Sequence, residues 1–368
     1  MIKKTIIGLA TLIGLFAIFM TLFTQYAPQF GAVPTSPFLA RIQASPHYQK
    51  GKFVNDIKTN LNLSPRAMAK TMWEFATAKN VRPRKPLPTT FDDLIVESPV
   101  DDTRVQVTWF GHSAVLLEMA GQTILLDPML GPAASPVSFF GRRFAYRNPI
   151  PLDQLTAIDA VVYSHDHYDH LDYTSVRYLK DKTQHFFVPL GVGAHLRHWG
   201  VADTNITELD WWESANRSGI TFTATPARHF SGRGLTDRDQ TLWASWVIQG
   251  AQAKLYFSGD SGYGPHFRQI GERYGPFDFT MIECGQYNEK WEAIHMMPYQ
   301  SLQAHLDVRG RVMMPIHWGA FNLSVHPWRE PVEWLLQSAQ GKEVPVVIPI
   351  IGERFDISRT ALGEAWWK

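Results

Sequence analysis

The sequence predicts an α/β protein in which two β-sheets pack face to face and helices cover their outer faces. Two observations indicate this fold class. From Val105 onward, short runs of β-forming residues alternate with turns and helical segments, and the alternation recurs in the second half of the chain. A dense group of histidines and aspartates, at 165–170, directly follows one apolar strand. Because loops at strand ends usually carry chemistry, we expect the reactive groups along one edge of the sandwich.

The composition is that of a well-packed globular protein. The chain has 368 residues, of which 45% are hydrophobic and 19% charged, and these proportions exclude a disordered chain. The formal net charge is +1, so there is no electrostatic argument for a nucleic acid as the partner. Cys284 is the only cysteine, which excludes an intrachain disulfide and argues against a cysteine-rich structural zinc site.

Residues 1–27 are predicted to be a transmembrane anchor or signal segment. Lys3 and Lys4 precede an uncharged run of 19 residues, from Thr5 to Phe23, which is long enough to cross a bilayer as a helix. The residues that follow offer poor signal-peptidase sites, so we expect an uncleaved single-pass anchor, with a cleaved signal peptide as the alternative. With the lysines in the cytoplasm, the large domain would lie in the periplasm, at a bacterial inner membrane.

Residues 28–100 are predicted to be a linker with short helices. Several prolines interrupt regular structure near its start. Ser64 followed by Pro65 is typical of a helix start. Residues 82–88 are rich in proline and basic residues, and we interpret them as a solvated connector. Residues 101–368 then form the large α/β domain.

The predicted elements of the large domain fall into two halves. Strands of the first half are expected at 105–109, 114–118, 123–127, 160–163 and 185–188, with a helix at 173–179. Strands of the second half are expected at 220–225, 241–248, 254–258, 277–282 and 312–316, with helices near 265–274, 298–307 and 331–338. Each half therefore supplies strands for a sheet and helices beside it.

The six residues from His165 to His170 are predicted to bind two metal ions. His165 and His167 are two positions apart, so both rings can reach one metal from an extended or turning loop. Asp169 and His170 follow at a spacing that suits a second metal. Zn²⁺ takes imidazole and carboxylate ligands in this way. The alternative is a solvated loop that happens to be rich in His and Asp, and the position directly after an apolar strand argues against it.

Three later residues complete the candidate site. His229, Asp260 and His317 each follow a predicted strand of the second half. A carboxylate at Asp260 can bridge two cations and hold them ~3.5–4 Å apart, and Gly259 would let the backbone come close to them. Each residue alone would be an ordinary core or surface residue, but their shared position at strand ends predicts metal ligands.

The cluster and these three residues resemble the metallo-β-lactamase superfamily, and more closely the N-acylphosphatidylethanolamine-hydrolysing phospholipases D. The similarity runs from about residue 109 to 333. It includes the segments 109–112, 127–128, 164–173, 187–191, 208–213, 242–246, 259–263, 270–271, 275–278 and 316–319. The Asp-Trp-Trp-Glu segment at 210–213 and the His-Trp-Gly turn at 317–319 separate this family from other proteins of the fold. Residues 286–294 and the first 100 residues match the family poorly.

The resemblance implies a metallo-β-lactamase αββα sandwich that holds two zinc ions, with iron or manganese possible in place of one. The implied ligands of one zinc are His165, His167 and His229, those of the other are Asp169, His170 and His317, and Asp260 bridges both. Asp260 and His295 are the implied catalytic residues, because Asp260 would orient the attacking water and His295 would lie near the reacting phosphate. His112 matches a family position near the metals, in either a structural or a direct role.

The implied reaction is hydrolysis of a phospholipid phosphodiester. Two zinc ions would lower the pKa of water from ~15.7 toward ~7. The products from an N-acylphosphatidylethanolamine-like phospholipid would be phosphatidic acid and an N-acylethanolamine. A membrane anchor fits such a substrate, because a tethered enzyme meets lipid at high local concentration. The alternatives are a metal-dependent lactonase or other ester hydrolase, and a membrane-anchored, non-catalytic metal-binding protein.

Overall fold

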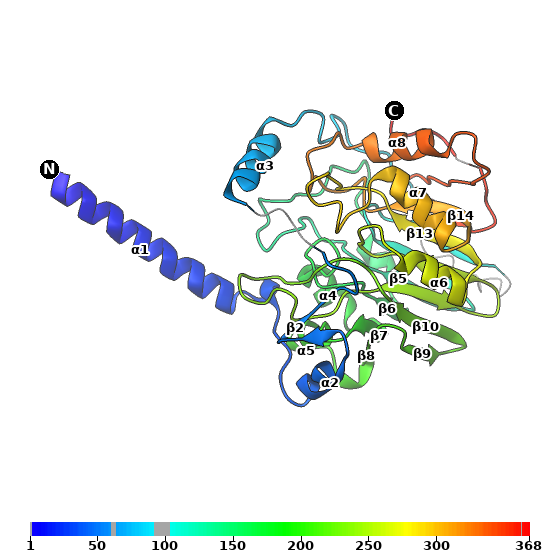
Figure 1. Cartoon of the computed structure of the whole chain (residues 1–368), viewed down its shortest axis with the longest axis horizontal. Coiled ribbons are helices and arrows are strands. Elements are labelled where there is room, and N and C mark those ends of the chain that lie inside the picture. The colour runs from blue at the N-terminus through cyan, green and yellow to red at the C-terminus, as the bar shows by residue number, and fades with distance from the viewer. Residues whose placement is uncertain (1, 60–63, 92–103, 362) are drawn as a thin grey trace.

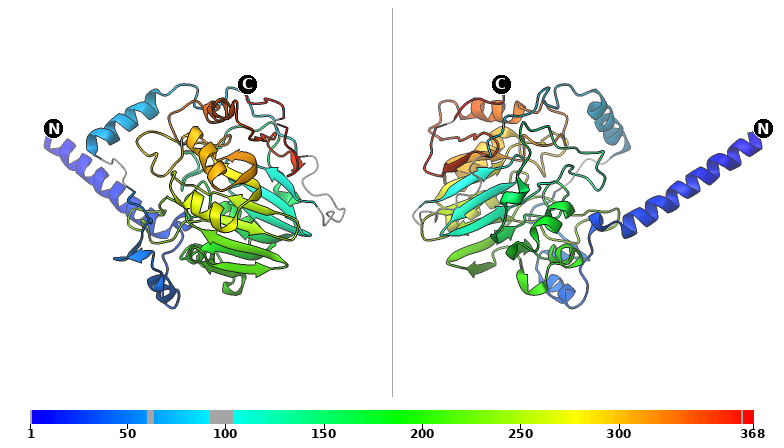
Figure 2. Two further views of the ribbon diagram at one scale, coloured as in Figure 1. Left: turned by 45° about the vertical axis from the view of Figure 1, so that its right-hand side comes forward. Right: turned by 180° about the vertical axis from the view of Figure 1, so that it is seen from behind.

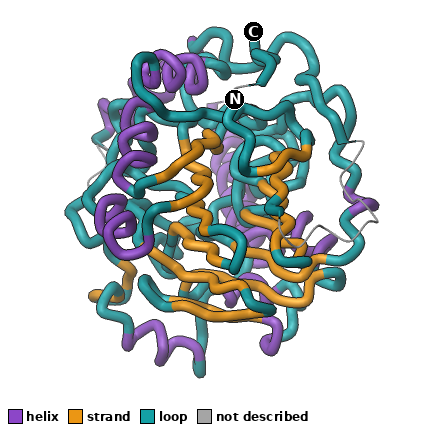
Figure 3. Tube along the Cα trace, turned by 90° about the vertical axis from the view of Figure 1, so that its right-hand side faces the viewer, coloured by secondary structure: helices purple, strands orange, loops and turns teal. Residues whose placement is uncertain are grey.

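Two β-sheets form the centre of the protein, and most helices lie outside them (Figure 1). The structure is a computed structural model that describes residues 2–59, 64–91, 104–361 and 363–368. Seen from the side, the strands of both sheets gather in the interior of the domain (Figure 3). The rings of Phe187 and Phe222, one from each sheet, stack with their centroids 4.2 Å apart. This arrangement confirms the predicted αββα sandwich.

The larger sheet has seven strands in the order β15-β3-β4-β5-β6-β7-β8. Its strands are β3 (Gln106–Trp109), β4 (Val115–Met119), β5 (Gln122–Leu126), β6 (Ile158–Val162), β7 (Thr183–Pro189), β8 (Ile206–Leu209) and β15 (Arg354–Asp356). The strands from β5 to β8 are parallel. Their carboxyl ends therefore meet at one edge, where Asp127 and the His165–His170 loop follow β5 and β6.

The smaller sheet has six strands in the order β14-β13-β12-β11-β10-β9. Its strands are β9 (Ser214–Arg217), β10 (Ile220–Thr225), β11 (Ser245–Gln249), β12 (Lys254–Phe257), β13 (Phe277–Glu283) and β14 (Gly310–Ile316). β12, β13 and β14 are parallel, so Asp260, Glu283 and His317 lie at the same sheet edge. The strand predicted at 241–248 begins only at Ser245, because the amides of Leu242 and Ala244 donate to the carbonyls of Leu190 and Ser164, at 2.8 and 2.9 Å, and not to a neighbouring strand of the smaller sheet.

The helices of the domain connect strands and cover the sheets. They are α4 (Tyr173–Leu179), α5 (Gly193–His198), α6 (His266–Tyr274), α7 (Pro298–Asp307) and α8 (Glu330–Ala339), with 3₁₀ turns η1 (Pro28–Phe30), η2 (Leu152–Gln154) and η3 (Asp203–Asn205). Asp172 caps α4 by accepting a 2.8 Å hydrogen bond from the Ser175 amide. α4 and α7 have the predicted bounds. α6 begins one residue later than predicted, and α8 extends one residue further at each end.

The N-terminal helix α1 (Ile2–Tyr26) projects from the domain (Figures 1 and 2). Its apolar stretch, Thr5–Tyr26, is long enough to cross a membrane and is not buried against the protein. It can therefore serve as a membrane anchor or as a signal sequence. It is followed by the short elements α2 (Phe38–Ala44), β1 (Tyr48–Gln49) and β2 (Lys52–Phe53), and then by α3 (Pro65–Thr77). The side chain of Ser64 accepts the capping hydrogen bond at the start of α3, as predicted.

Much of the segment predicted as a linker packs against the domain. Phe53 and Leu87 are only 2% and 3% exposed, and the Leu87 amide donates a 2.8 Å hydrogen bond to the Ala145 carbonyl. The interpretation of residues 82–88 as a solvated connector is therefore wrong at Leu87, because burial stabilises its apolar side chain while Arg84 and Lys85 stay exposed. The predicted domain boundary between residues 100 and 101 lies outside the described residues.

Candidate metal centre

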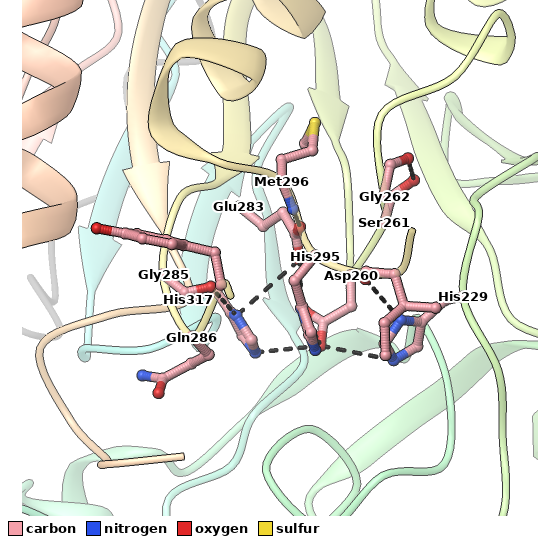
Figure 4. Close-up of polar contacts among 12 residues, drawn as sticks. His229, Asp260, Ser261, Gly262, Glu283, Gly285, Gln286, His295, Met296 and His317 are labelled. Atoms are coloured by element: carbon pink, nitrogen blue, oxygen red, sulfur yellow. Dashed lines mark hydrogen bonds and ion pairs between the residues drawn. The ribbon is translucent and has the colours of Figure 1, made fainter. Parts of the chain in front are cut away.

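The candidate metal centre lies where the carboxyl ends of the parallel strands of both sheets meet. All seven predicted ligands come together there: the loop after β6 supplies His165, His167, Asp169 and His170, and the loops after β10, β12 and β14 supply His229, Asp260 and His317. Figure 4 shows Asp260 and His295 between His317 on one side and His229 on the other. The nitrogen and oxygen atoms form groups whose members lie within 4.8 Å of one another.

One group consists of His165, His167 and His229. The Nδ1 atom of His167 lies 2.9 Å from His165 Nε2 and 3.1 Å from His229 Nε2. Burial, followed by the neighbouring imidazoles, holds the pKa of His165 and of His229 well below the usual value. Neutral imidazole rings can offer lone pairs to a metal ion. A tetrahedral zinc with bonds of 2.0–2.1 Å requires its ligand nitrogens to lie about 3.3 Å from one another. The spacing therefore suits a single cation.

A second group consists of His112, Asp169, His170 and His317. Asp169 Oδ2 lies 3.3 Å from His317 Nε2 and 3.5 Å from His170 Nε2. His112 Nε2 approaches the same oxygen to 2.8 Å. Burial and then the neighbouring His317 lower the pKa of His112 to about 3, so a neutral His112 donates a hydrogen bond to Asp169. The resemblance implies either a structural or a direct role for His112. Its hydrogen bond with Asp169 favours the structural role.

Asp260 faces both groups. Its Oδ2 atom is 3.1 Å from the Nε2 atoms of His170 and His317. The same atom is 3.9 Å from His165 Nε2 and 3.8 Å from His229 Nε2. Within the described parts of the chain, its buried Oδ1 atom has no hydrogen-bond partner. A carboxylate oxygen buried in this way normally has a partner, so the position calls for a cation or water.

The charges of the site also call for cations. Burial opposes ionisation of Asp260, but His170 and His317 outweigh it and hold the carboxyl pKa well below its usual range. Burial would lower the pKa of His317, yet Asp260 and Asp169 raise it to about 10. In the metal-free protein, protons on imidazoles therefore balance the carboxylates, and a divalent ion can take their place. Imidazole nitrogens and carboxylate oxygens, converging in a buried site, fit metal ions of the zinc type.

Hydrogen bonds around the site fix the orientation of the candidate ligands. Asp127 Oδ2 lies 2.7 Å from His170 Nδ1, while its Oδ1 accepts a 2.6 Å hydrogen bond from the Ser164 amide. The hydroxyl of Ser164 lies 2.9 Å from His165 Nδ1. The Ile294 carbonyl lies 2.9 Å from Nδ1 of His229. These contacts occupy one nitrogen of each ring and direct the other inward.

The buried side chain of Arg233 connects the metal loop to the segment after α1. Its Nη1 donates to the carbonyls of Asp166 and, at 2.7 Å, of Leu171. Its Nε and Nη2 donate to the Gln29 carbonyl at 3.0 and 2.8 Å. His195 makes a parallel connection, because its Nδ1 accepts a 3.1 Å hydrogen bond from the Ala32 amide and its Nε2 lies 3.3 Å from Asp166. The polypeptide at 29–32 is therefore part of the support of the metal loop.

His295, the second predicted catalytic residue, lies beside the candidate ligands. Its Nδ1 is 3.1 Å from Glu283 Oε2 and 3.9 Å from Asp260 Oδ2. Glu283 is fully buried, and its other oxygen accepts a 2.6 Å hydrogen bond from the Met296 amide. Burial raises the pKa of Glu283, although His295 opposes that rise. Among the described residues, His295 Nε2 has no hydrogen-bond partner, so this nitrogen is available to a ligand.

A pocket of about 500 Å³ opens above the site. Its floor includes His167, Asp169, Asp260, His295 and His317. Its walls are largely apolar and include Met68, Met72, Phe75, Phe230, Trp291, Ile294 and Leu323. Three of these wall residues belong to α3, which the sequence predicted only as a short helix of a linker. A concave, mostly apolar pocket with a few convergent polar groups is typical of a small-molecule or lipid site.

Four contributors to the site were missed in the sequence: α3, Asp127, Arg233 and Glu283. Asp127 directly follows β5 and Glu283 ends β13, and a charged residue at the end of an apolar strand was an available signal. Arg233 and α3 gave no such signal, because their roles depend on contacts between residues far apart in the chain. The Lys290 ammonium, for example, pairs with Glu74 of α3 and donates to Thr71 at 3.2 Å.

Comparison with known proteins gives consistent results. A family model described as "Beta-lactamase superfamily domain" matches residues 122–318. An uncharacterized protein of Mycobacterium tuberculosis is 43% identical over 332 residues, which are 89% of this chain and 88% of that protein. The N-acyl-phosphatidylethanolamine-hydrolyzing phospholipase D 1 of Caenorhabditis elegans is 34% identical over 64% of this chain and 70% of its own length. Igni18, a metallo hydrolase from Ignicoccus hospitalis, has the same fold, with a TM-score of 0.54 and 23% identity over 69% of this chain and 98% of its own.

Proposed function

The chain belongs to the metallo-β-lactamase superfamily and is a metal-dependent hydrolase, and from this premise we propose that it is a dinuclear zinc phosphodiesterase of the phospholipase D type. Its proposed substrates are N-acylphosphatidylethanolamine-like phospholipids, and its products are phosphatidic acid and an N-acylethanolamine. The similarity to the worm phospholipase D supports this assignment. We also propose that α1 anchors the enzyme in the bacterial inner membrane, with the catalytic domain in the periplasm.

We assign the seven candidate ligands to two zinc ions. His165, His167 and His229 would hold one, Asp169, His170 and His317 would hold the other, and Asp260 would contact both. Bound zinc ions would make a water molecule acidic enough to attack at neutral pH and would neutralise charge on the phosphoryl oxygens. His165, His167 and His229 form one group of donor atoms, and Asp169, His170 and His317 belong to another. Asp260 Oδ2 lies within 3.9 Å of histidines in both groups, which supports two ions rather than one.

The protein's own groups can orient the nucleophile and serve the leaving group. Asp260 Oδ1, which has no partner among the described residues, can accept a hydrogen bond from the attacking water. Glu283 holds His295 through Nδ1 at 3.1 Å. His295 Nε2 can then donate a proton to the leaving oxygen of the N-acylethanolamine or to a phosphoryl oxygen. Asp260 and His295 are thus the proposed catalytic residues, and Glu283 is a positioning residue.

The apolar pocket above the metal ligands is the observation that carries the lipid assignment. It places Met68, Met72 and Phe75 of α3 within the same 500 Å³ cavity as Asp260 and His295. A small polar ester would leave most of these walls in contact with water, whereas acyl chains would cover them and gain about 25 cal/mol per Å² of apolar surface buried. The pocket therefore favours a substrate with acyl chains over a small polar ester.

The test is to give the purified full-length protein N-acylphosphatidylethanolamine in mixed micelles, with and without a chelator. We expect phosphatidic acid and N-acylethanolamine in equal amounts, loss of both with chelator, and recovery on addition of Zn²⁺. Parallel assays with diacylphosphatidylethanolamine and with lactones test the substrate class. Rapid lactone opening without phosphodiester cleavage by zinc-loaded protein would overturn the proposal in favour of a lactonase. Less than one bound metal ion per chain would favour a non-catalytic protein.

A further inference from the structure

Large apolar side chains are exposed on three separate segments of the protein. On α3, Met72 and Trp73 are 72% and 70% exposed. The loop after β5 exposes Phe139 and Phe140, at 81% and 68%, and the loop after β10 exposes Leu235 at 88%. We call these five residues the apolar rim. Two adjacent phenylalanines exposed to this degree are unusual on a water-facing surface and indicate a partner.

The three segments lie on the same side of the domain, and α1 projects from that side. Figure 1 shows α3, the loop before residue 145 and the loop after β10 along the left of the domain, next to the end of α1, and the reverse view in Figure 2 agrees. The pocket above the metal ligands also reaches this side, because α3 forms part of its wall. If α1 spans a bilayer, the apolar rim faces the surface of that bilayer.

Basic side chains accompany each part of the apolar rim. Arg66, Lys70 and Lys79 are exposed on or beside α3, Arg142 follows the two phenylalanines, and Arg238 follows Leu235. The acidic residues of these segments have partners within the protein: Glu74 pairs with Lys290, and Asp237 accepts hydrogen bonds from two backbone amides, at 2.8 and 3.0 Å. Lys70 and Arg238 pair with Glu74 and Asp239, whereas Arg66, Lys79 and Arg142 add positive charge beside the apolar tips. Apolar tips with basic residues beside them are typical of surfaces that dock at the headgroup region of anionic membranes.

We propose that the apolar rim is a second membrane contact, which docks the mouth of the pocket onto an anionic phospholipid leaflet. The contact would let an acyl chain pass from the leaflet into the pocket along α3 without crossing water. The proposal deepens the proposed function, on which it rests for the identity of the lipid, and it goes beyond anchoring by α1. The anchor alone keeps the domain near the bilayer, whereas the apolar rim sets the orientation of the pocket toward it.

The test labels the full-length protein with an environment-sensitive fluorophore at Phe140→Cys and reconstitutes it in vesicles of phosphatidylcholine and phosphatidylglycerol. The native Cys284 is buried, and unsubstituted protein measures any labelling there. Arg268→Cys on α6 is the matched control, since its side chain is 78% exposed on a helix away from α1 (Figure 1). We expect a blue shift and quenching by nitroxide-bearing lipids at position 140 only. Equal spectra at positions 140 and 268 would overturn the proposal.

A second measurement separates docking from catalysis. The double variant Phe139→Ser, Phe140→Ser should retain its metal content and its rate on a short-chain, monomeric phosphodiester, but lose roughly tenfold in rate on vesicles. Equal rates on vesicles for variant and parent would contradict the docking surface. A docked label in a protein that cleaves no phospholipid would overturn the proposed function alone and support the docking surface. Phospholipid cleavage by a protein whose label does not dock would overturn the docking surface and support the proposed function.

Discussion

The floor of the pocket and its roof, which is the part of the wall that α3 forms, are built in opposite ways. The floor consists of buried imidazoles and carboxylates, and most of these are held by further hydrogen bonds with Asp127, Ser164 and backbone carbonyls. The roof is α3, in which no residue is buried. It contacts the domain through the stacking of Phe75 on Trp291 and through Lys290. The polar groups of the floor are thus fixed by many contacts and the apolar wall at α3 by few.

The difference has a physical reason. A two-metal site needs donor atoms placed within a few tenths of an ångström, and such placement requires rigid elements and a second layer of hydrogen bonds. A wall that admits flexible acyl chains needs only apolar surface and freedom to adjust, which exposed methionines provide. We therefore expect substitutions in the floor to abolish the reaction, and substitutions in the roof to alter the choice of lipid.

Asp260→Asn should have the largest effect. The substitution removes the negative charge that faces both groups of histidines. We expect loss of bound metal and a fall in hydrolysis of roughly a thousandfold, since several kcal/mol of charge stabilisation correspond to that factor. Metal analysis and rates in mixed micelles measure it, with the exposed Asp181→Asn as control. A variant that keeps both its metals and its rate would remove Asp260 from the site.

Arg233→Lys tests the support of the floor. A lysine cannot reproduce the contacts of the guanidinium with Asp166, Leu171 and Gln29. We expect zinc affinity to fall about 10–100-fold, as for other residues that orient ligands, while circular dichroism stays unchanged. Competition with a chromophoric chelator measures the affinity. The exposed Arg238→Lys is the matched control, and equal affinities for the two variants would show that the metal loop does not need this support.

The same contrast decides what the sequence could predict. The grouping of the seven candidate ligands was predictable, because imidazoles and carboxylates at the ends of apolar strands form a local pattern. The strands β8 and β9 were not predicted, since β9 (Ser214–Arg217) lacks an apolar alternation. The position of α3 over the pocket could not be predicted from the sequence either. It depends on contacts such as that of Lys290 with Glu74, and the sequence around either residue gives no indication of the other.

His295→Gln distinguishes a catalytic residue from a metal ligand. The imidazole lies 3.9 Å from Asp260 but is held by Glu283, so we expect unchanged zinc content and a kcat about a hundredfold lower. Glutamine keeps a hydrogen-bonding group but cannot transfer a proton. The measurement pairs metal analysis with kcat and KM. If one zinc were lost along with activity, His295 would belong to the ligands.

Met72→Ser in the roof should have the smallest effect. Met72 lines the pocket although it is 72% exposed, so it offers apolar surface that only a bound acyl chain would cover. A contact worth one methylene group, about 0.8 kcal/mol, corresponds to an increase in KM of roughly fourfold. We expect this increase for a long-chain lipid in mixed micelles, with kcat unchanged. Ala69→Ser is the control, because Ala69 lies exposed on the same helix but does not line the pocket. If KM rose equally for a short-chain substrate, Met72 would act on the fold of α3 rather than on the lipid.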